Sequence, residues 1–261
     1  MDNHVADLQR DIGGSPFTSL DSRVEAASQK VKVPRGNRLL ESLEDRTWDQ
    51  LQPHLESTPL VEGQVIEMVG QRSAFLYFPT KGGVSLEAGP ANAPMQLALV
   101  GREGLIGTGL LLGGVALCRS VVQFGGAARR IPTDALEVCL DKSPRLHRQL
   151  LLGVHAFLDR LSRMAWANGR SLIEQRLAYW LLSAADCLDT NHIPVTHQAL
   201  SNALGVRRPS VTIAMHALEQ TGAVRIQRGH IRILDSQRLA AAAGNGFAGP
   251  TALLGASHEK G

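Results

Sequence analysis

The chain has 261 residues, of which 44% are hydrophobic and 20% charged, and its formal net charge at pH 7 is +3. These values are ordinary for a globular protein with a sizeable core. No apolar stretch reaches the roughly 18 residues of a membrane span, which excludes a transmembrane helix and leaves no membrane partner to expect.

The chain contains three scattered cysteines, with no CxxC pair: Cys118, Cys139 and Cys187. A small and odd number of cysteines argues against a secreted disulfide scaffold and fits a reducing compartment. The N-terminus carries Asp2, Asp7 and Asp11 and has no apolar signal core. We therefore expect a cytoplasmic protein.

The first 142 residues predict an arm followed by an all-β domain. Residues 1–36 are polar and mixed in charge, and we expect a mobile N-terminal arm. Leucines at helical spacing within residues 37–53 predict one or two short amphipathic helices. Between Leu60 and Ile131, short apolar runs alternate with glycine and proline turns every 8–12 residues or so. This pattern predicts an antiparallel β-barrel or jelly roll over residues 37–142, as one part of an α+β fold.

One long helical pattern occupies residues 143–168. Its apolar stripe recurs at alternating spacings of three and four residues and consists of Leu146, Leu150, Gly153, Phe157, Leu161, Met164 and Asn168. Such a stripe is typical of a seam between two helices, so we expect a dimerisation helix and a homodimer. The alternative is that the stripe packs on the chain's own barrel.

Residues 169–242 predict a winged helix-turn-helix. After a helix expected over residues 170–190, Thr196 is a suitable N-cap for a helix from His197 to Leu204. Gly205 then supplies a sharp turn that requires a positive φ. A second helix is expected from Arg208 to Thr221, with Pro209 in its first turn. Two short helices joined by a glycine turn are the helix-turn-helix pattern.

A β-hairpin wing is expected to follow the second helix. Residues 223–227 and 230–234 alternate apolar with polar residues on either side of the turn at Arg228 and Gly229. Between residues 205 and 232 there is one acidic residue, Glu219, against five arginines: Arg207, Arg208, Arg225, Arg228 and Arg232. Such a local surface attracts phosphate, although a merely solvated arginine-rich face is the alternative. Residues 243–261 are rich in glycine and alanine and are expected to form a flexible tail.

The Crp/Fnr family of transcription regulators has a DNA-binding module that resembles residues 193–224, IPVTHQALSNALGVRRPSVTIAMHALEQTGAV, and an entry helix that resembles residues 175–182, QRLAYWLL. The resemblance extends to the architecture of residues 37–242, a cyclic-nucleotide-binding-like barrel, a dimer helix and a winged domain. It implies a dimeric, sequence-specific regulator that reads a pseudo-palindromic site in double-stranded DNA, with RNA polymerase as a partner if the regulator is an activator.

By that resemblance, Thr196, His197 and Gln198 would meet phosphate, and Arg208, Pro209 and Ile213 would occupy the base-reading positions. Many relatives carry a Glu and a second Arg where this chain has Pro209 and Ile213, so its sequence preference should differ. Together with the outward face of the second helix and the wing, the expected DNA-binding residues are Thr196, His197, Gln198, Arg207, Arg208, Pro209, Ser210, Thr212, Ile213, His216 and Arg228.

The resemblance also suggests an effector site in the barrel. Residues 101–109 resemble the start of the family's cyclic-nucleotide cassette, and Arg119 and Ser120 resemble its end. Thr108 follows Gly107 where the ribose-binding glutamate would stand, so we do not expect the usual binding of cyclic AMP. Arg119 is then either structural or a ligand of a different anion. The cofactor stays unknown, because the sequence has no iron–sulfur or metal motif.

Two other functions stay open at this point. One is an enzyme built on the barrel with an accessory DNA-binding tail, and the other is an effectorless interaction protein that uses the basic domain. The sequence shows no carboxylate pair with a histidine, nucleophile elbow or phosphate loop. We therefore expect no enzyme.

Overall fold

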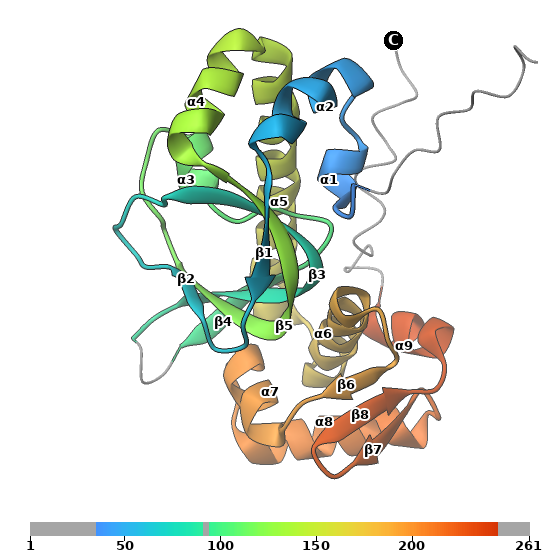
Figure 1. Ribbon diagram of the computed structural model, residues 1–261. Helices are drawn as coiled ribbons and strands as arrows, with labels where there is room; N and C mark the ends of the chain where they lie inside the picture. The colour runs from blue at the N-terminus through green and yellow to red at the C-terminus, as the bar shows by residue number, and fades with distance from the viewer. Residues whose placement is uncertain (1–34, 91–93, 245–261) are drawn as a thin grey trace, which may run out of the picture. The chain divides into compact units, whose positions relative to one another are not determined.

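The structure is a computed structural model that describes residues 35–90 and 94–244 (Figure 1). Residues 1–34 of the predicted arm and residues 245–261 of the predicted tail lie outside the described residues. Described residues form an antiparallel sheet with short helices, a long helix and a small winged helical unit, which confirms the α+β class.

The described fold begins two residues before the predicted boundary. Arg35 is only 4% exposed, and its guanidinium donates hydrogen bonds to the carbonyl oxygens of Leu40 and Leu43. It also pairs with Asp45 at 2.6 Å. Arg35 therefore belongs to the folded domain and not to the arm, because its partners lie in and between the first two helices, α1 (Arg38–Glu41) and α2 (Asp45–Leu51). The 3₁₀ turn Gln52–His54 follows α2.

Five antiparallel strands form the N-terminal sheet: β1 (Glu56–Leu60), β2 (Val65–Glu67), β3 (Phe75–Ala88), β4 (Met95–Val100) and β5 (Arg119–Pro132). The order is β1-β5-β3-β4. Both β1 and β2 pair with β5, β1 with its C-terminal half and β2 with its N-terminal half. The predicted antiparallel sheet is thus confirmed, but β3 and β5 each run through 14 residues where the sequence predicted short strands. The helices α3 (Thr108–Leu111) and α4 (Thr133–Lys142) precede and follow β5.

Glycines allow β3 and β5 to cross closely where the register shifts between Pro79 and Val84. Gly82 has φ +82°, and a Cβ there would lie 2.5 Å from the carbonyl oxygen of Phe124. A Cβ on Gly126 would lie 2.2 Å from the carbonyl oxygen of Lys81. Neither contact is possible for a larger residue, so these glycines let the two long strands bend over their own core.

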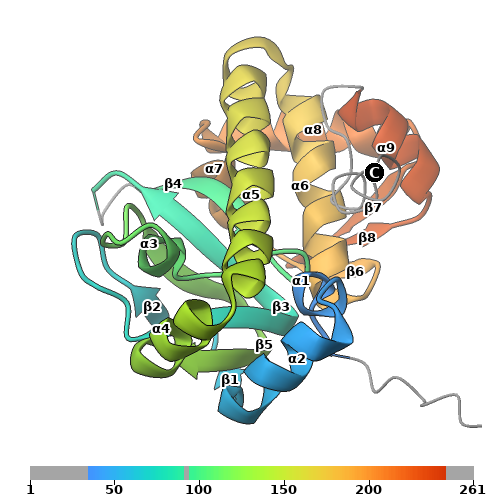
Figure 2. The same cartoon turned by 90° about the horizontal axis from the view of Figure 1, so that it is seen from above.

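The long helix α5 (Pro144–Arg170) crosses one face of the sheet (Figures 1 and 2). Leu146 and Leu150 are 0% exposed and pack in the chain's own core. Gly153 abuts Leu39, since a Cβ on it would lie 2.8 Å from that side chain. The N-terminal part of the predicted stripe therefore contacts the chain's own sheet domain, which was the alternative to a seam between two chains, and the dimer itself stays a prediction.

The opposite face of α5 carries exposed apolar side chains. Leu152 and Leu158 are each 54% exposed and Trp166 is 58% exposed. Apolar residues thus lie on both sides of this helix, and their spacing alone does not reveal which side contacts the sheet.

The C-terminal unit comprises α6 (Ile173–Leu188), β6 (His192–Pro194), α7 (His197–Leu204), α8 (Arg208–Gln220), β7 (Val224–Gln227), β8 (His230–Ile233) and α9 (Ser236–Ala243). Its core also takes in Leu99 and Phe124 from the sheet. Leu177, Leu200, Val211 and Ile231 are buried together in that core. Ala243 is buried on α9, so the packed unit extends past the predicted boundary at residue 242.

Candidate nucleic-acid interface

The two helices α7 and α8 form a helix-turn-helix with the predicted caps. The Thr196 hydroxyl accepts a hydrogen bond from the backbone N–H of Ala199 at 3.1 Å, which caps α7. Gly205 ends α7 with φ +63°. Both predictions are confirmed, because a side-chain cap and a left-handed glycine are the local means of starting and stopping a short helix.

Helix α8 presents one buried and one exposed face. Val211 and Met215 lie in the core of the C-terminal unit. Arg208 and Pro209 are exposed in the first turn, and Ile213 is 67% exposed. The outward face therefore combines a cationic and an apolar side chain, neither of which is covered by the described residues.

Three strands build the wing beside α8. Strand β8 pairs with β7 and also with β6, which the sequence indicated only as an extended segment. One carboxylate oxygen of Glu219, on α8, accepts a hydrogen bond from the backbone N–H of Ile226 at 2.9 Å. This contact joins the wing to α8 and was missed from the sequence, where the only signal was a single acid among five arginines. We call α7, α8 and the wing (His192–Ile233) the reading head.

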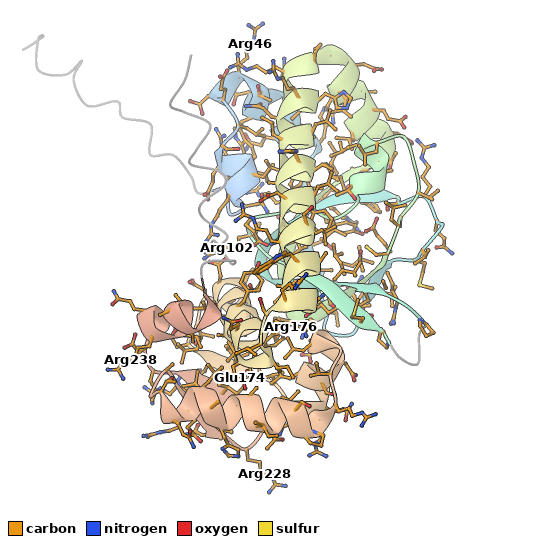
Figure 3. All side chains as sticks on the ribbon, turned by 180° about the vertical axis from the view of Figure 1, so that it is seen from behind. Arg46, Arg102, Glu174, Arg176, Arg228 and Arg238 are labelled. Carbon is orange, nitrogen blue, oxygen red and sulfur yellow. The ribbon has the colours of Figure 1, made fainter. Side chains whose placement is uncertain are left out.

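The reading head carries an unneutralised cationic surface. Its five arginines are exposed, and none of them forms an ion pair with a described residue: Arg207, Arg208, Arg225, Arg228 and Arg232. Arg228 projects outward at the edge of the wing (Figure 3). Unpaired guanidinium groups on one surface raise the local potential and attract a polyanion.

The remaining predicted DNA-binding side chains differ in their exposure and in whether they form hydrogen bonds within the protein. The Nδ1 atom of His197 lies 3.1 Å from the Thr212 hydroxyl, which bridges α7 and α8 and leaves both side chains half-buried. Ser210 is also half-buried, whereas His216 is exposed. Gln198 is exposed and donates to Asn202 at 3.0 Å. The predicted residues therefore lie at the start of α7, along α8 and in the turn of the wing, with His197 and Thr212 bonded to each other within the protein.

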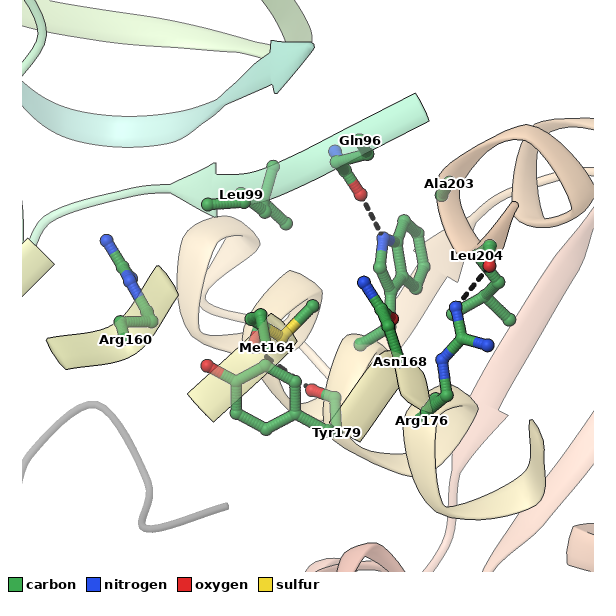
Figure 4. Close-up of a pocket in the computed structure, with 12 residues that line it drawn as sticks. Gln96, Leu99, Arg160, Met164, Asn168, Arg176, Tyr179, Ala203 and Leu204 are labelled. Carbon is green, nitrogen blue, oxygen red and sulfur yellow. Dashed lines mark hydrogen bonds between the residues drawn. The ribbon is translucent and has the colours of Figure 1, made fainter. Parts of the chain in front are cut away.

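Hydrogen bonds and packing attach the entry helix α6 to the sheet. The indole N–H of Trp180 donates to the side-chain oxygen of Gln96, on β4, at 2.6 Å (Figure 4). The carboxylate of Asp186 pairs with Arg38 at 2.6 Å. Cys187 packs so closely that a Cβ on Gly101 would lie 2.6 Å from its sulfur. The cavity drawn in Figure 4 has a volume of about 20 Å³, which is room for a water molecule and not for an effector.

The predicted effector residues form two separate pairs, which lie next to opposite ends of β3. Gly107 caps α3 with φ +103°, and a Cβ on it would lie 2.9 Å from the carbonyl oxygen of Phe75. The other pair adjoins the last residues of β3, where Arg119 pairs with Glu87 at 3.3 Å. Ser120 is fully buried and donates to Glu67 at 2.7 Å. Arg119 and Ser120 therefore already hold carboxylates of the chain itself.

Two further properties concern the described residues alone. None of the helices in residues 35–90 and 94–244 combines the length and apolarity of a membrane span. In the same residues, no group of three or more His, Cys, Asp or Glu side chains is placed to hold a metal ion.

Residues 175–242 match the family model of the Crp-like helix-turn-helix domain. No curated protein matches the chain. Among solved structures, the fold is similar to FixK2 from Bradyrhizobium japonicum, with 16% identity, a TM-score of 0.62 and coverage of 72% of this chain and 96% of that one. It is also similar to the c-di-GMP responsive global regulator CLP from Xanthomonas campestris, with 15% identity, a TM-score of 0.59 and coverage of 73% of this chain and 99% of that one.

A third similar structure is TTHA1359, a transcriptional regulator of the CRP/FNR family from Thermus thermophilus, with 23% identity, a TM-score of 0.53 and coverage of 72% and 98%. These likenesses establish the fold, and the domain match establishes the type of DNA-binding module. The resemblance indicated by the sequence is therefore confirmed: the chain joins a Crp-like helix-turn-helix domain to the N-terminal fold of Crp/Fnr family transcription regulators.

Proposed function

We propose that this chain is a homodimeric transcription regulator that reads a pseudo-palindromic DNA site through the outward face of α8. The observation that carries the proposal is the exposed face with Arg208 and Ile213, flanked by a wing whose arginines have no acidic partner among the described residues. A helix of this kind fits the major groove while the basic wing meets the phosphate backbone.

Base reading is assigned to the first turns of α8. Arg208 can donate two parallel hydrogen bonds to a guanine edge, which is worth about 1–3 kcal/mol of discrimination. Ile213 offers only an apolar contact, which suits a thymine methyl group. Pro209 has no side-chain hydrogen-bond donor or acceptor, so it can contribute only to the steric fit in the groove. The preferred site should therefore differ from that of relatives with charged residues at these two positions.

Phosphate contacts are assigned to the N-terminus of α7 and to the wing. Thr196, His197 and Gln198 begin α7, where backbone N–H groups also point at a phosphate. Arg207 precedes α8, and Arg228 lies in the turn of the wing. These contacts position the duplex without reading its sequence.

A second copy of the chain is the partner we propose for the exposed face of α5. Leu152, Leu158 and Trp166 are all more than half exposed along this 27-residue helix. Pairing through this face would bury them and set two reading heads about 34 Å apart, which is the spacing of half-sites one turn apart on DNA. If the bound dimer activates transcription, its further partner is RNA polymerase.

The sheet domain, in this proposal, does not hold a cyclic nucleotide in the usual way. Glu87 neutralises Arg119, and Glu67 accepts the Ser120 hydroxyl, so a phosphate in their place would meet two carboxylates. Thr108 also lacks the carboxylate that a glutamate would offer to the ribose hydroxyls. An unpaired ribose hydroxyl would weaken binding by roughly 1–3 kcal/mol.

The test begins by selecting the preferred duplex from a random library and measuring affinity by fluorescence anisotropy. Arg208→Ala should relax preference at one base position in each half-site, whereas Arg228→Ala should weaken all duplexes alike and reduce the salt slope by about 1. Arg145→Ala, on an exposed arginine at the start of α5, serves as the control and should change neither. Equal effects of the first two substitutions would contradict the assigned roles.

A further inference from the structure

A polar cleft lies between the sheet and the first helix of the reading head. Its volume is about 160 Å³. Ser85, Glu87, Gln96 and Gln123 line it from strands β3, β4 and β5, and Asn202 and Ala203 line it from α7. None of its lining residues lies on α8 or at Gly107, and it adjoins the second predicted effector pair through Glu87, which pairs with Arg119.

The side chains in this cleft have hydrogen-bonding capacity left over. Gln96 donates to both the Ser85 hydroxyl, at 2.8 Å, and the side-chain oxygen of Gln123, at 2.6 Å. The Ser85 hydroxyl hydrogen and the Gln123 amide nitrogen then have no acceptor among the described residues. Asn202 accepts from Gln198 with its oxygen, which likewise leaves its amide nitrogen available. The cleft therefore offers three donors.

Acceptor capacity comes from Glu87. One of its oxygens lies 3.3 Å from Arg119, and the other has no donor among the described residues. Because Arg119 neutralises the carboxylate, the cleft as a whole carries no net charge. This set favours an uncharged ligand that offers acceptor oxygens, such as carbonyl groups, to the amide donors and an N–H to Glu87.

Size and apolar contacts narrow the ligand further. A cavity of about 150 Å³ accepts a benzene ring, so about 160 Å³ fits a single small ring system. The methyl groups of Ala199 and Ala203 and the ring of Pro94 supply flat apolar contacts. We propose that this cleft binds a small, uncharged, planar heterocycle with a lactam or imide edge, the chemistry of an oxo-substituted nucleobase.

Gln96 connects this cleft to the reading head. Its amide nitrogen bonds the cleft residues, and its oxygen accepts from Trp180 on α6, the helix that enters the winged unit. A ligand that binds Ser85 and Gln123 competes for their hydrogen bonds with Gln96 and thereby alters the hydrogen bond between Gln96 and Trp180. Occupation of the cleft then shifts the reading head relative to the sheet, and this regulatory part rests on the proposed function.

The binding test uses calorimetry on the full chain with uracil and hypoxanthine as probes and with pyrimidine and purine as matched rings that lack the carbonyl groups. We expect at least one oxo compound to bind tenfold or more tightly than its parent ring. Gln123→Glu and Asn202→Asp each keep the existing acceptor oxygen and remove a cleft donor, so each should weaken binding at least tenfold. Gln64→Glu makes the same change at an exposed position outside the cleft and should have no effect.

Absence of binding up to about 1 mM, equal binding of the parent rings, or insensitivity to both cleft variants would overturn the site. The regulatory part is tested by the change in DNA affinity when ligand is added, which Trp180→Phe should abolish while calorimetry still detects binding. Binding with no change in DNA affinity overturns the regulation alone. Failure of the protein to prefer any duplex overturns the proposed function but leaves the calorimetric result standing.

Discussion

The ion pair between Arg160 on α5 and Glu103 after β4 is buried, and its disruption should be costly. The two side chains are 14% and 8% exposed. Burial alone would lower the pKa of Arg160, but the charge and hydrogen bond of Glu103 hold it above its ordinary value. Glu103 also accepts from the backbone N–H of Gly101 at 3.1 Å. Arg160→Met therefore leaves a buried carboxylate without its cation, at a cost of about 3–5 kcal/mol.

The assay is urea and thermal unfolding at a fixed protein concentration, followed by circular dichroism. Arg160→Met should lower the midpoint temperature by roughly 6–20 °C, given about 2–4 °C per kcal/mol for a protein of this size. Arg145→Met makes the same change on the same helix at an exposed pair with Glu44 and should cost about 0–1 kcal/mol. Adding Glu103→Gln to Arg160→Met removes the orphaned charge and should restore most of the stability. Equal costs for the two arginine substitutions would refute the reasoning.

Three further predictions follow from burial and exposure. Leu158→Asp should shift the chain from dimer to monomer in sedimentation velocity, because it places a charge in the proposed interface. The control Leu117→Asp changes a residue that is 83% exposed and lies outside α5, so it should leave the dimer intact. Dissociation by both substitutions or by neither contradicts the proposed interface. Trp180→Phe should lower the free energy of unfolding by about 1–3 kcal/mol, because the buried oxygen of Gln96 loses its donor. Urea titration at several protein concentrations measures this change. A loss below about 0.5 kcal/mol contradicts the prediction. Burial, and to a smaller extent Glu67, raises the pKa of the Cys118 thiol from 9.0 to about 11, so the unfolded chain ionises first and stability is lost between those pH values. Cys118→Ala should flatten this loss in unfolding titrations from pH 8 to 11, and an unchanged slope contradicts the assignment.

The helix-turn-helix could be predicted from the sequence because its determinants are local. Thr196 caps the helix that begins one residue later, and Gly205 ends that helix at its last turn. The alternation of residues 223–234 about Gly229 fixes a two-stranded hairpin in the same way. Each of these signals depends on neighbours within a few residues, so one sequence is enough to reveal them.

The orientation of α5 and the junction with the sheet could not be predicted in this way. Leu146 and Leu152 are both apolar, and only the rest of the fold decides that the first is buried and the second exposed. Trp180 and Gln96 are 84 residues apart in the chain. No periodicity links residues at that separation, because their contact arises only when α6 packs against β4 in the folded chain.

Glu219 holds the wing through the Ile226 N–H and lies on a different side of α8 from the outward side chains. Arg208, Pro209 and Ile213 make no side-chain hydrogen bond within the described residues, so exchanging them leaves that anchorage in place. We therefore expect single substitutions at these positions to change which DNA sequence is preferred, while the phosphate contacts that hold the duplex stay the same. Descendants of such a protein can diversify their target genes without passing through forms that no longer hold DNA.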